Sequence, residues 1–147
     1  MNPYKIVPMT LFDLDSISEQ MDSDFETFWS YSMFQKELEN PDNFYLVVKD
    51  ENDMILGFGG VWQSVEDMHI TCIVTHKNFR KKGIGSLILE KLIQIAKQKH
   101  MNSITLEVRE SNSIAQALYL KYAFQIVGRR KKYYQGIEDA MIMTLFI

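Results

Sequence analysis

The sequence has little cysteine and no long hydrophobic run, and these two absences exclude several classes of protein. A single cysteine, Cys72, among 147 residues excludes an internal disulfide framework and is typical of a reducing compartment. No stretch approaches the roughly 18 consecutive apolar residues that span a bilayer, and no apolar signal-peptide core follows Met1. The three histidines and the cysteine lack metal-site spacing, so we predict no metal. We therefore expect a cytoplasmic protein that works without a membrane.

The chain has the size and composition of one globular domain, with its charge unevenly spread. At 147 residues, with 46% hydrophobic and 24% charged residues, it can build one core, and we predict a single domain over residues 1–147. Residues 1–53 contain twelve acidic residues and three lysines, whereas residues 54–147 contain seven acidic and thirteen basic residues. This polarity suggests that one half handles an anion and that the other attracts a cationic group.

Strand-like and helix-like patterns alternate along the chain. The predicted strands are residues 5–7, 44–48, 55–63, 68–74, 104–108, 124–127 and 141–146. Helices are predicted after Thr10, Ser30 or Ser32, the turn at 80–86, and Asn112 or Ser113. The resulting order, β-α-α-β-β-β-α-β-α-β-β, predicts an α/β protein with a mixed sheet flanked by helices, and a basic segment, 129–134, joins the last two strands. Gly57, Gly59 and Gly60 inside one strand predict a bulge or a close backbone approach.

A glycine-containing basic turn joins the strand at 68–74 to a long amphipathic helix. Its sequence is Arg80-Lys81-Lys82-Gly83-Ile84-Gly85-Ser86. Glycines allow close backbone approach, the first amides of a helix lack internal partners, and the helix dipole favours an anion there. The turn therefore predicts the pyrophosphate site of a nucleotide-like cofactor. The alternative is a solvated basic turn that starts a surface helix.

Glu107 and Tyr119 are candidates for acid–base catalysis, whereas Cys72 is not a candidate nucleophile. Glu107 is a lone carboxylate in a strand of apolar residues, and it either faces solvent or, partly desolvated, accepts a proton from a substrate. Tyr119, on the following helix, either anchors that helix or donates a phenolic proton. Strand alternation places His69 on the face opposite Cys72, so we predict a buried structural thiol at Cys72.

Several stretches, in the same order, resemble the GCN5-related N-acetyltransferase (GNAT) superfamily over essentially the whole chain. Residues 80–85 fit that family's Arg/Gln-x-x-Gly-x-Gly/Ala loop for the pyrophosphate of acetyl-CoA. Five shorter stretches resemble the ribosomal-protein-alanine N-acetyltransferases: residues 28–30, 106–112, 117–119, 130–134 and 138–143. In the first of these, Phe28 replaces the proline of that subfamily's Pro-Trp-Ser element.

The resemblance implies a GNAT fold: a twisted, mostly antiparallel sheet that splays open between its fourth and fifth strands, with about four helices. Acetyl-CoA would enter that opening, its pantetheine arm against the backbone of residues 73–75. Glu107 would be the general base and Tyr119 the general acid toward the departing thiolate. The cofactor-binding residues implied are Ile73, Val74, Thr75, Arg80, Lys81, Lys82, Gly83, Ile84, Gly85, Ser86, Asn112 and Tyr119.

The acceptor implied is an amine, most simply the α-amino group of a protein N-terminus such as that of a ribosomal protein. The aromatic stretch 25–29 is either a binding wall or a lid over the core, and Trp29, Tyr133 and Tyr134 are candidate acceptor contacts. An acidic rim from the N-terminal half would suit a basic N-terminus. One alternative acceptor is a small amine such as a polyamine or aminoglycoside. Another possibility is a non-enzymatic module that binds RNA through residues 129–132 and the two tyrosines.

Overall fold

The computed structural model describes residues 3–27, 30–134 and 136–147. Its strands are β1 (Lys5–Pro8), β2 (Asn43–Lys49), β3 (Ile55–Gln63), β4 (Asp67–Thr75), β5 (Ser103–Arg109), β6 (Gln125–Tyr134) and β7 (Glu138–Phe146). Its α-helices are α1 (Leu11–Ile17), α2 (Tyr31–Glu39), α3 (Ile84–Gln98) and α4 (Ser113–Lys121), with short 3₁₀ helices η1 (Ser18–Gln20) and η2 (Lys77–Phe79). In the described parts of the chain, no helix combines the length and apolar composition needed to cross a membrane.

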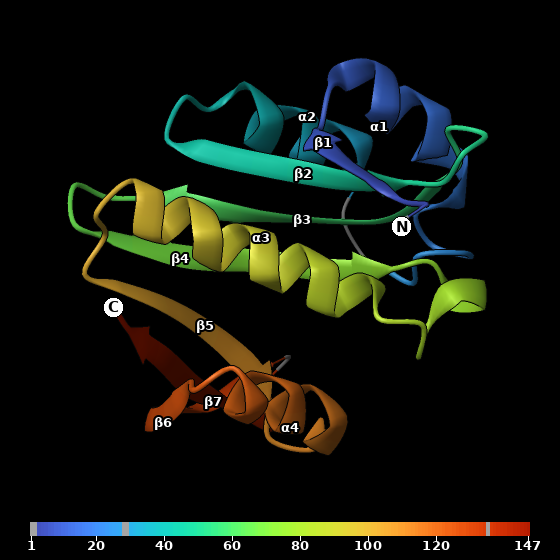
Figure 1. Ribbon diagram of the computed structural model, residues 1–147. Helices are drawn as coiled ribbons and strands as arrows, with labels where there is room; N and C mark the ends of the chain where they lie inside the picture. Colours follow the sequence, from blue (N-terminus) through green and yellow to red (C-terminus); the bar gives the residue numbers. More distant parts are fainter. Residues whose placement is uncertain (1–2, 28–29, 135) are drawn as a thin grey trace.

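The strands form one sheet in the order β1-β2-β3-β4-β5-β7-β6. Among the described strands, β4 and β5 are parallel neighbours, and the other neighbouring pairs are antiparallel. Figure 1 shows α3 running along β3 and β4, whereas β5, β7 and β6 lie with α4 in the other half of the molecule. The predicted mixed sheet with four helices, and the predicted order of its strands and helices, are confirmed.

Side-chain caps fix where α1 and α2 begin. The Thr10 hydroxyl accepts a hydrogen bond from the Asp13 amide at 3.1 Å, and the Asp13 carboxylate accepts one from the Thr10 amide at 2.9 Å. This capping box satisfies two amides that a helix start leaves without partners. The Ser30 hydroxyl caps α2 by accepting from the Met33 amide at 3.3 Å. Lys49 then ties α1 to β2 through an ion pair with Asp13 at 2.8 Å.

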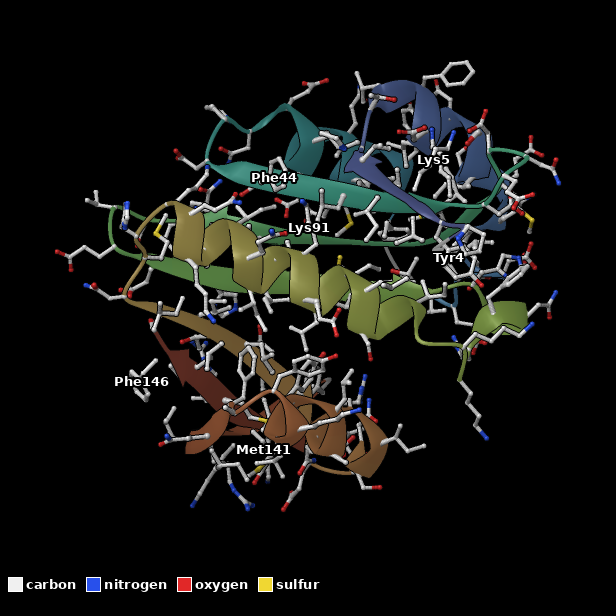
Figure 2. All side chains as sticks on the ribbon, in the orientation of Figure 1. Tyr4, Lys5, Phe44, Lys91, Met141 and Phe146 are labelled. Carbon is white, nitrogen blue, oxygen red and sulfur yellow. The ribbon has the colours of Figure 1, made fainter. Side chains whose placement is uncertain are left out.

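A separate hydrophobic core lies on each face of the sheet. On one face, Ile88 and Leu92 of α3 are completely buried in a cluster that includes Met143 of β7. On the other face, Phe25 packs against Phe58 with ring centroids 5.5 Å apart, which makes it a lid over the second core. Within β7, Met141 packs against the first core, whereas Phe146 projects into solvent at the C-terminal end (Figure 2).

The glycines of β3 allow α3 to approach the sheet closely. A Cβ added at Gly59 would lie 2.7 Å from Ile88 Cγ2, and one at Gly57 would lie 2.9 Å from Ile84 Cγ2. The pairing of β3 with β4 also shifts by one residue between Gly60 and Val61, which leaves Thr71 as an extra residue in β4. The predicted close approach is therefore present, whereas the extra residue opposite Gly60 belongs to β4 and not to the strand that contains the glycines.

Two sequence-based predictions about local geometry are wrong. The segment 129–134 is not a connection between strands, because it continues β6 through to Tyr134. The extra residue Thr71 also shifts the side-chain alternation of β4, so that His69 lies on the same face of the sheet as Cys72 rather than on the opposite one.

Candidate functional site

The site begins where β4 and β5 part. Their parallel ladder pairs Asp67 with Ser103 and ends at the pair His69–Thr105. The bulge at Thr71 follows directly, and a bulge bends its strand and increases the local twist. The C-terminal half of β4 therefore extends beyond its ladder with β5 and leaves backbone groups on that side for a ligand.

A cavity of about 680 Å³ lies along this parting. It is bounded by β4, the turn before α3, α4 and the loop after α1. Its walls include eleven of the twelve residues expected to bind the cofactor: Ile73, Val74, Thr75, Arg80, Lys81, Gly83, Ile84, Gly85, Ser86, Asn112 and Tyr119. The twelfth, Lys82, lies outside this wall, with its Nζ 5.2 Å from the centre of the Phe79 ring.

The start of α3 supplies the anion-binding end of the cavity. Gly83, the N-cap of α3, has a φ of 83°, Lys81 has a φ of 64°, and no side chain caps this helix start. Left-handed residues beside a helix N-terminus turn successive amides toward one point, which is the geometry of an anion nest. A Cβ at Gly83 would meet nothing within 4 Å, so the backbone surface there is open. These residues fit a diphosphate group.

Helix α4 forms a wall that the sequence analysis identified only in part. The Asn112 side-chain oxygen caps α4 by accepting from the Ala115 amide at 3.1 Å. Ile114, Ala115, Leu118 and Tyr119 then line the cavity from one side of the helix. The spacing of these residues is that of a single helical face, so the helical period predicts Ile114, Ala115 and Leu118 once Tyr119 is taken as a site residue.

The loop after η1 also lines the cavity, and two of its acidic residues are paired with basic side chains. Phe25 and Glu26 line the cavity, and the sequence analysis did not assign either residue to the cofactor site. Glu26 forms an ion pair with Arg80 at 3.0 Å, and Asp24 lies 3.5 Å from the Lys77 amine. These carboxylates hold the loop to the turn before α3, and the acidic rim expected for a basic acceptor stays a prediction.

Glu107 lies on β5 in the half of the sheet beyond the parting, with only 9% of its side chain exposed. Its Oε1 is 3.8 Å from His69 Nε2 and 3.5 Å from an Arg130 guanidinium nitrogen. Its Oε2 is buried without a hydrogen-bond partner among the described residues. A buried carboxylate oxygen without a hydrogen-bond donor is costly. Glu107 is not among the residues that line the cavity.

Two tyrosines, Tyr119 and Tyr134, are held in their protonated form, and the second of them lies near the Glu107 carboxylate. Burial, together with the nearby Tyr134 and Cys72, raises the pKa of Tyr119 to about 12. Burial and the Glu107 carboxylate likewise raise the pKa of Tyr134. A phenol that stays protonated at neutral pH can donate a proton and cannot act as a base.

Of the three predicted acceptor contacts, Tyr133 and Tyr134 lie within the described residues. Trp29 and its neighbour Phe28 lie outside the described residues. Tyr133 and Tyr134 lie at the end of β6 with ring centroids 5.1 Å apart, and the Arg109 guanidinium lies 4.4 Å from the Tyr134 ring centre. Arg130, also on β6, lies 3.5 Å from Glu107 Oε1, so the side chains of β6 and β5 meet at this carboxylate.

Cys72 has the properties of a structural thiol. It packs against the second core, and burial raises the pKa of its thiol to about 12. We expect iodoacetamide at pH 8 to alkylate Cys72 at least about a hundredfold more slowly in the folded protein than in urea, because so little thiolate is present. Mass spectrometry of timed samples measures both rates. Equal rates would show that the thiol is exposed and reactive.

Within residues 3–27, 30–134 and 136–147, no group of three or more His, Cys, Asp or Glu side chains could hold a metal ion. The groups that the site offers to a ligand are the buried Glu107 carboxylate, the protonated Tyr119 phenol and the backbone amides at the parting of β4 and β5.

Comparison with known proteins gives a consistent result. Residues 11–124 match the acetyltransferase (GNAT) family. A Bacillus subtilis (strain 168) protein named putative [ribosomal protein bS18]-alanine N-acetyltransferase is 36% identical over 141 residues, which are 95% of this chain and 93% of that protein. The crystal structure of the ribosomal-protein-S18-alanine N-acetyltransferase from Escherichia coli has a TM-score of 0.89 at 24% identity and covers 98% of this chain and 94% of its own. A GNAT family acetyltransferase from Elizabethkingia anophelis, solved with acetyl-CoA bound, has a TM-score of 0.78 at 22% identity and covers 100% of both chains.

Proposed function

We propose that this chain, an N-acetyltransferase that belongs to the acetyltransferase (GNAT) family, transfers the acetyl group of acetyl-CoA to the α-amino group of a protein N-terminus. A ribosomal protein is the acceptor that the relatives suggest, because the similar Bacillus subtilis and Escherichia coli proteins are named for alanine acetylation of a ribosomal protein. We place this activity in the cytoplasm, where ribosomal proteins are made.

The observation that carries the proposal is the buried Oε2 of Glu107, which lies beside the parting of two strands and has no hydrogen-bond partner within residues 3–27, 30–134 and 136–147. A carboxylate there can remove a proton from an amine that approaches a thioester lying along β4. The open amides at the start of α3 support a diphosphate at residues 81–86, and Asn112 lies in the wall opposite. The cavity wall includes both this turn and Ile73 and Val74 of β4, so we expect the pantetheine arm to lie along that strand.

The energetics of deprotonation favour a protein N-terminus over a lysine. An α-amine has a pKa near 8 and a lysine near 10.4, and each pKa unit above the ambient pH costs about 1.4 kcal/mol. At pH 7 the N-terminus therefore costs about 1–2 kcal/mol and a lysine about 4.6 kcal/mol. A single carboxylate, acting directly or through one water, is sufficient for the first task.

The remaining steps require a donor to the oxyanion and a proton for the departing thiolate. We infer that a backbone amide near Val74 stabilises the tetrahedral oxyanion, because β4 has lost its β5 partner there. Tyr119 is our candidate acid, since its raised pKa keeps the phenol protonated. The amine attacks the thioester directly, so no covalent enzyme intermediate is needed, and the inert Cys72 is compatible with this route.

Mass spectrometry of ribosomal proteins tests the proposal directly. The proteins are incubated with the enzyme and isotopically labelled acetyl-CoA, and the modified positions are identified. We expect label on an N-terminal α-amine and none on lysines. In parallel, turnover of an Ala-initiated peptide is compared with that of spermidine and an aminoglycoside. A preference for either small amine would overturn the protein-N-terminus assignment while leaving the acetyltransferase activity in place.

Replacing Tyr119 by phenylalanine should lower kcat without weakening acetyl-CoA binding. The ring remains to pack against Phe124, whose centroid lies 5.8 Å away, so only the proton donor is lost. We expect kcat to fall by about 10–100-fold. Steady-state kinetics measure kcat, and isothermal titration calorimetry measures the affinity for acetyl-CoA. An unchanged kcat would exclude Tyr119 as the required acid.

A further inference from the structure

The burial of Glu107 raises the question of how its proton reaches solvent. Acetylation of an ammonium group removes two protons from the nitrogen: one goes to the departing thiolate, and the other leaves the protein. If Glu107 takes the proton that finally leaves the protein, it must release that proton before the next turnover. Only 9% of the Glu107 side chain is exposed, so direct exchange with bulk water is restricted. A neighbouring group that both accepts protons and contacts solvent would provide the exit.

His69 is the neighbour with both properties. Its Nε2 lies 3.8 Å from Glu107 Oε1, and 37% of its side chain is exposed. Arg130 is closer to the same oxygen, at 3.5 Å, but a guanidinium does not lose its proton in proteins and cannot serve as an acceptor. The Tyr134 phenol is also held protonated. An imidazole, by contrast, can take up and release a proton near neutral pH.

We propose that His69 relays the proton from Glu107 to solvent, an inference that rests on the proposed function. The acceptor ammonium gives one proton to Glu107 Oε2, and the resulting neutral amine attacks the thioester. The carboxyl group then rotates so that its protonated oxygen takes the position facing His69, and it passes that proton to the unprotonated Nε2 of the imidazole. The imidazolium loses a proton to water or buffer, which restores both groups for the next turnover.

The geometry separates an entry side of the carboxylate from an exit side. His69 and Arg130 both approach Oε1, whereas Oε2 has no hydrogen-bond partner in the described part of the chain and is left for the acceptor. His69 is also the last residue of β4 in the ladder with β5, so its backbone is fixed opposite Thr105 while its ring reaches solvent. A gap of 3.8 Å is longer than a hydrogen bond, so transfer uses one bridging water or a small rotation of the exposed ring.

The other groups around His69 leave this route open. On its own strand, Asp67 accepts a hydrogen bond from the Ser103 hydroxyl at 2.8 Å. The paired residue on β3 is the uncharged Trp62, and the neighbours from β5 and β6 are Glu107 and Arg130. Glu37 of α2, on the same face of the sheet, accepts from the Tyr45 hydroxyl at 2.9 Å.

Chemical rescue distinguishes a relay from a structural role. The wild type is compared with His69→Ala, His69→Asn and the control His100→Asn, which replaces an exposed histidine between α3 and β5. Turnover of the Ala-initiated peptide is measured in dilute buffer across a range of pH. We expect kcat to fall about tenfold in both His69 variants and to be unchanged in His100→Asn. Added imidazole should restore most of the loss in His69→Ala, whereas sodium chloride at equal ionic strength should not.

Each outcome is decisive for the relay. Wild-type kcat and pH profile in both His69 variants would overturn it. A loss that imidazole does not rescue, in variants that keep the wild-type melting temperature, would overturn it in favour of a structural role. Failure of the wild type to acetylate any amine would instead count against the proposed function itself. An enzyme-free reaction with imidazole corrects for direct cleavage of the thioester.

Discussion

Replacing Glu107 by glutamine is expected to lower kcat for a peptide α-amine by about a hundredfold or more at pH 7. The amide has nearly the volume of the carboxylate but cannot accept a proton, so only acceptor molecules that are already neutral can react. The defect should shrink as the pH rises above 8, because the solvent then deprotonates the α-amine without help from the enzyme. Steady-state kinetics over this range, with calorimetry to show that acetyl-CoA still binds, measure both effects.

The matched control for this change is Glu110→Gln. Glu110 is exposed and forms an ion pair with Arg129 at 2.9 Å, and an exposed pair contributes little to stability. We expect its kcat to stay within about twofold of wild type. If Glu107→Gln were as active as Glu110→Gln, the base would be elsewhere. A defect in Glu107→Gln of constant size at every pH would mean that the carboxylate positions the acceptor and does not deprotonate it.

The features that the sequence predicted correctly depend on neighbouring residues. The caps Thr10, Ser30 and Asn112 satisfy amides only three residues ahead, so their signal lies within one helical turn. The turn at residues 80–86 likewise joins a strand to the helix that directly follows it. The order of strands and helices was predicted from such local signals. The opening between β4 and β5 was predicted only from the resemblance to the GNAT superfamily.

The features that sequence analysis missed depend on contacts between distant segments. Only the pairing of β4 with β3 identifies Thr71 as an extra residue. Because of it, His69 lies on the same face of the sheet as Cys72, and not on the opposite face as the sequence predicted. β6 continues to Tyr134 because it pairs with β7, where the Asp139 carboxylate accepts a hydrogen bond from the Lys132 amide at 2.7 Å. Glu26 lines the cavity and forms an ion pair with Arg80, a residue more than fifty positions away in the sequence.

Replacing Gly57 by alanine is expected to lower the free energy of unfolding by about 2–3 kcal/mol, a drop of roughly 4–10 °C in melting temperature. The new Cβ would lie 2.8 Å from the Val74 carbonyl oxygen and 2.9 Å from Ile84 Cγ2. The carbonyl belongs to β4 and cannot rotate away, so relief requires the strand or α3 to move. Both line the cavity, so KM for acetyl-CoA should also rise. Thermal unfolding and steady-state kinetics measure the two effects.

Gly128→Ala is the control that isolates this close approach from the general effect of adding a methyl group. Gly128 also lies within a strand, but a Cβ there would meet only Ile142 Cδ1, at an ordinary contact distance of 3.5 Å. Because alanine reduces the freedom of the unfolded chain, this variant should be neutral or more stable by up to about 1 kcal/mol. Equal destabilisation of the two variants would contradict our argument. A destabilised Gly57→Ala with an unchanged KM would show that the cavity tolerates movement of α3 against β4.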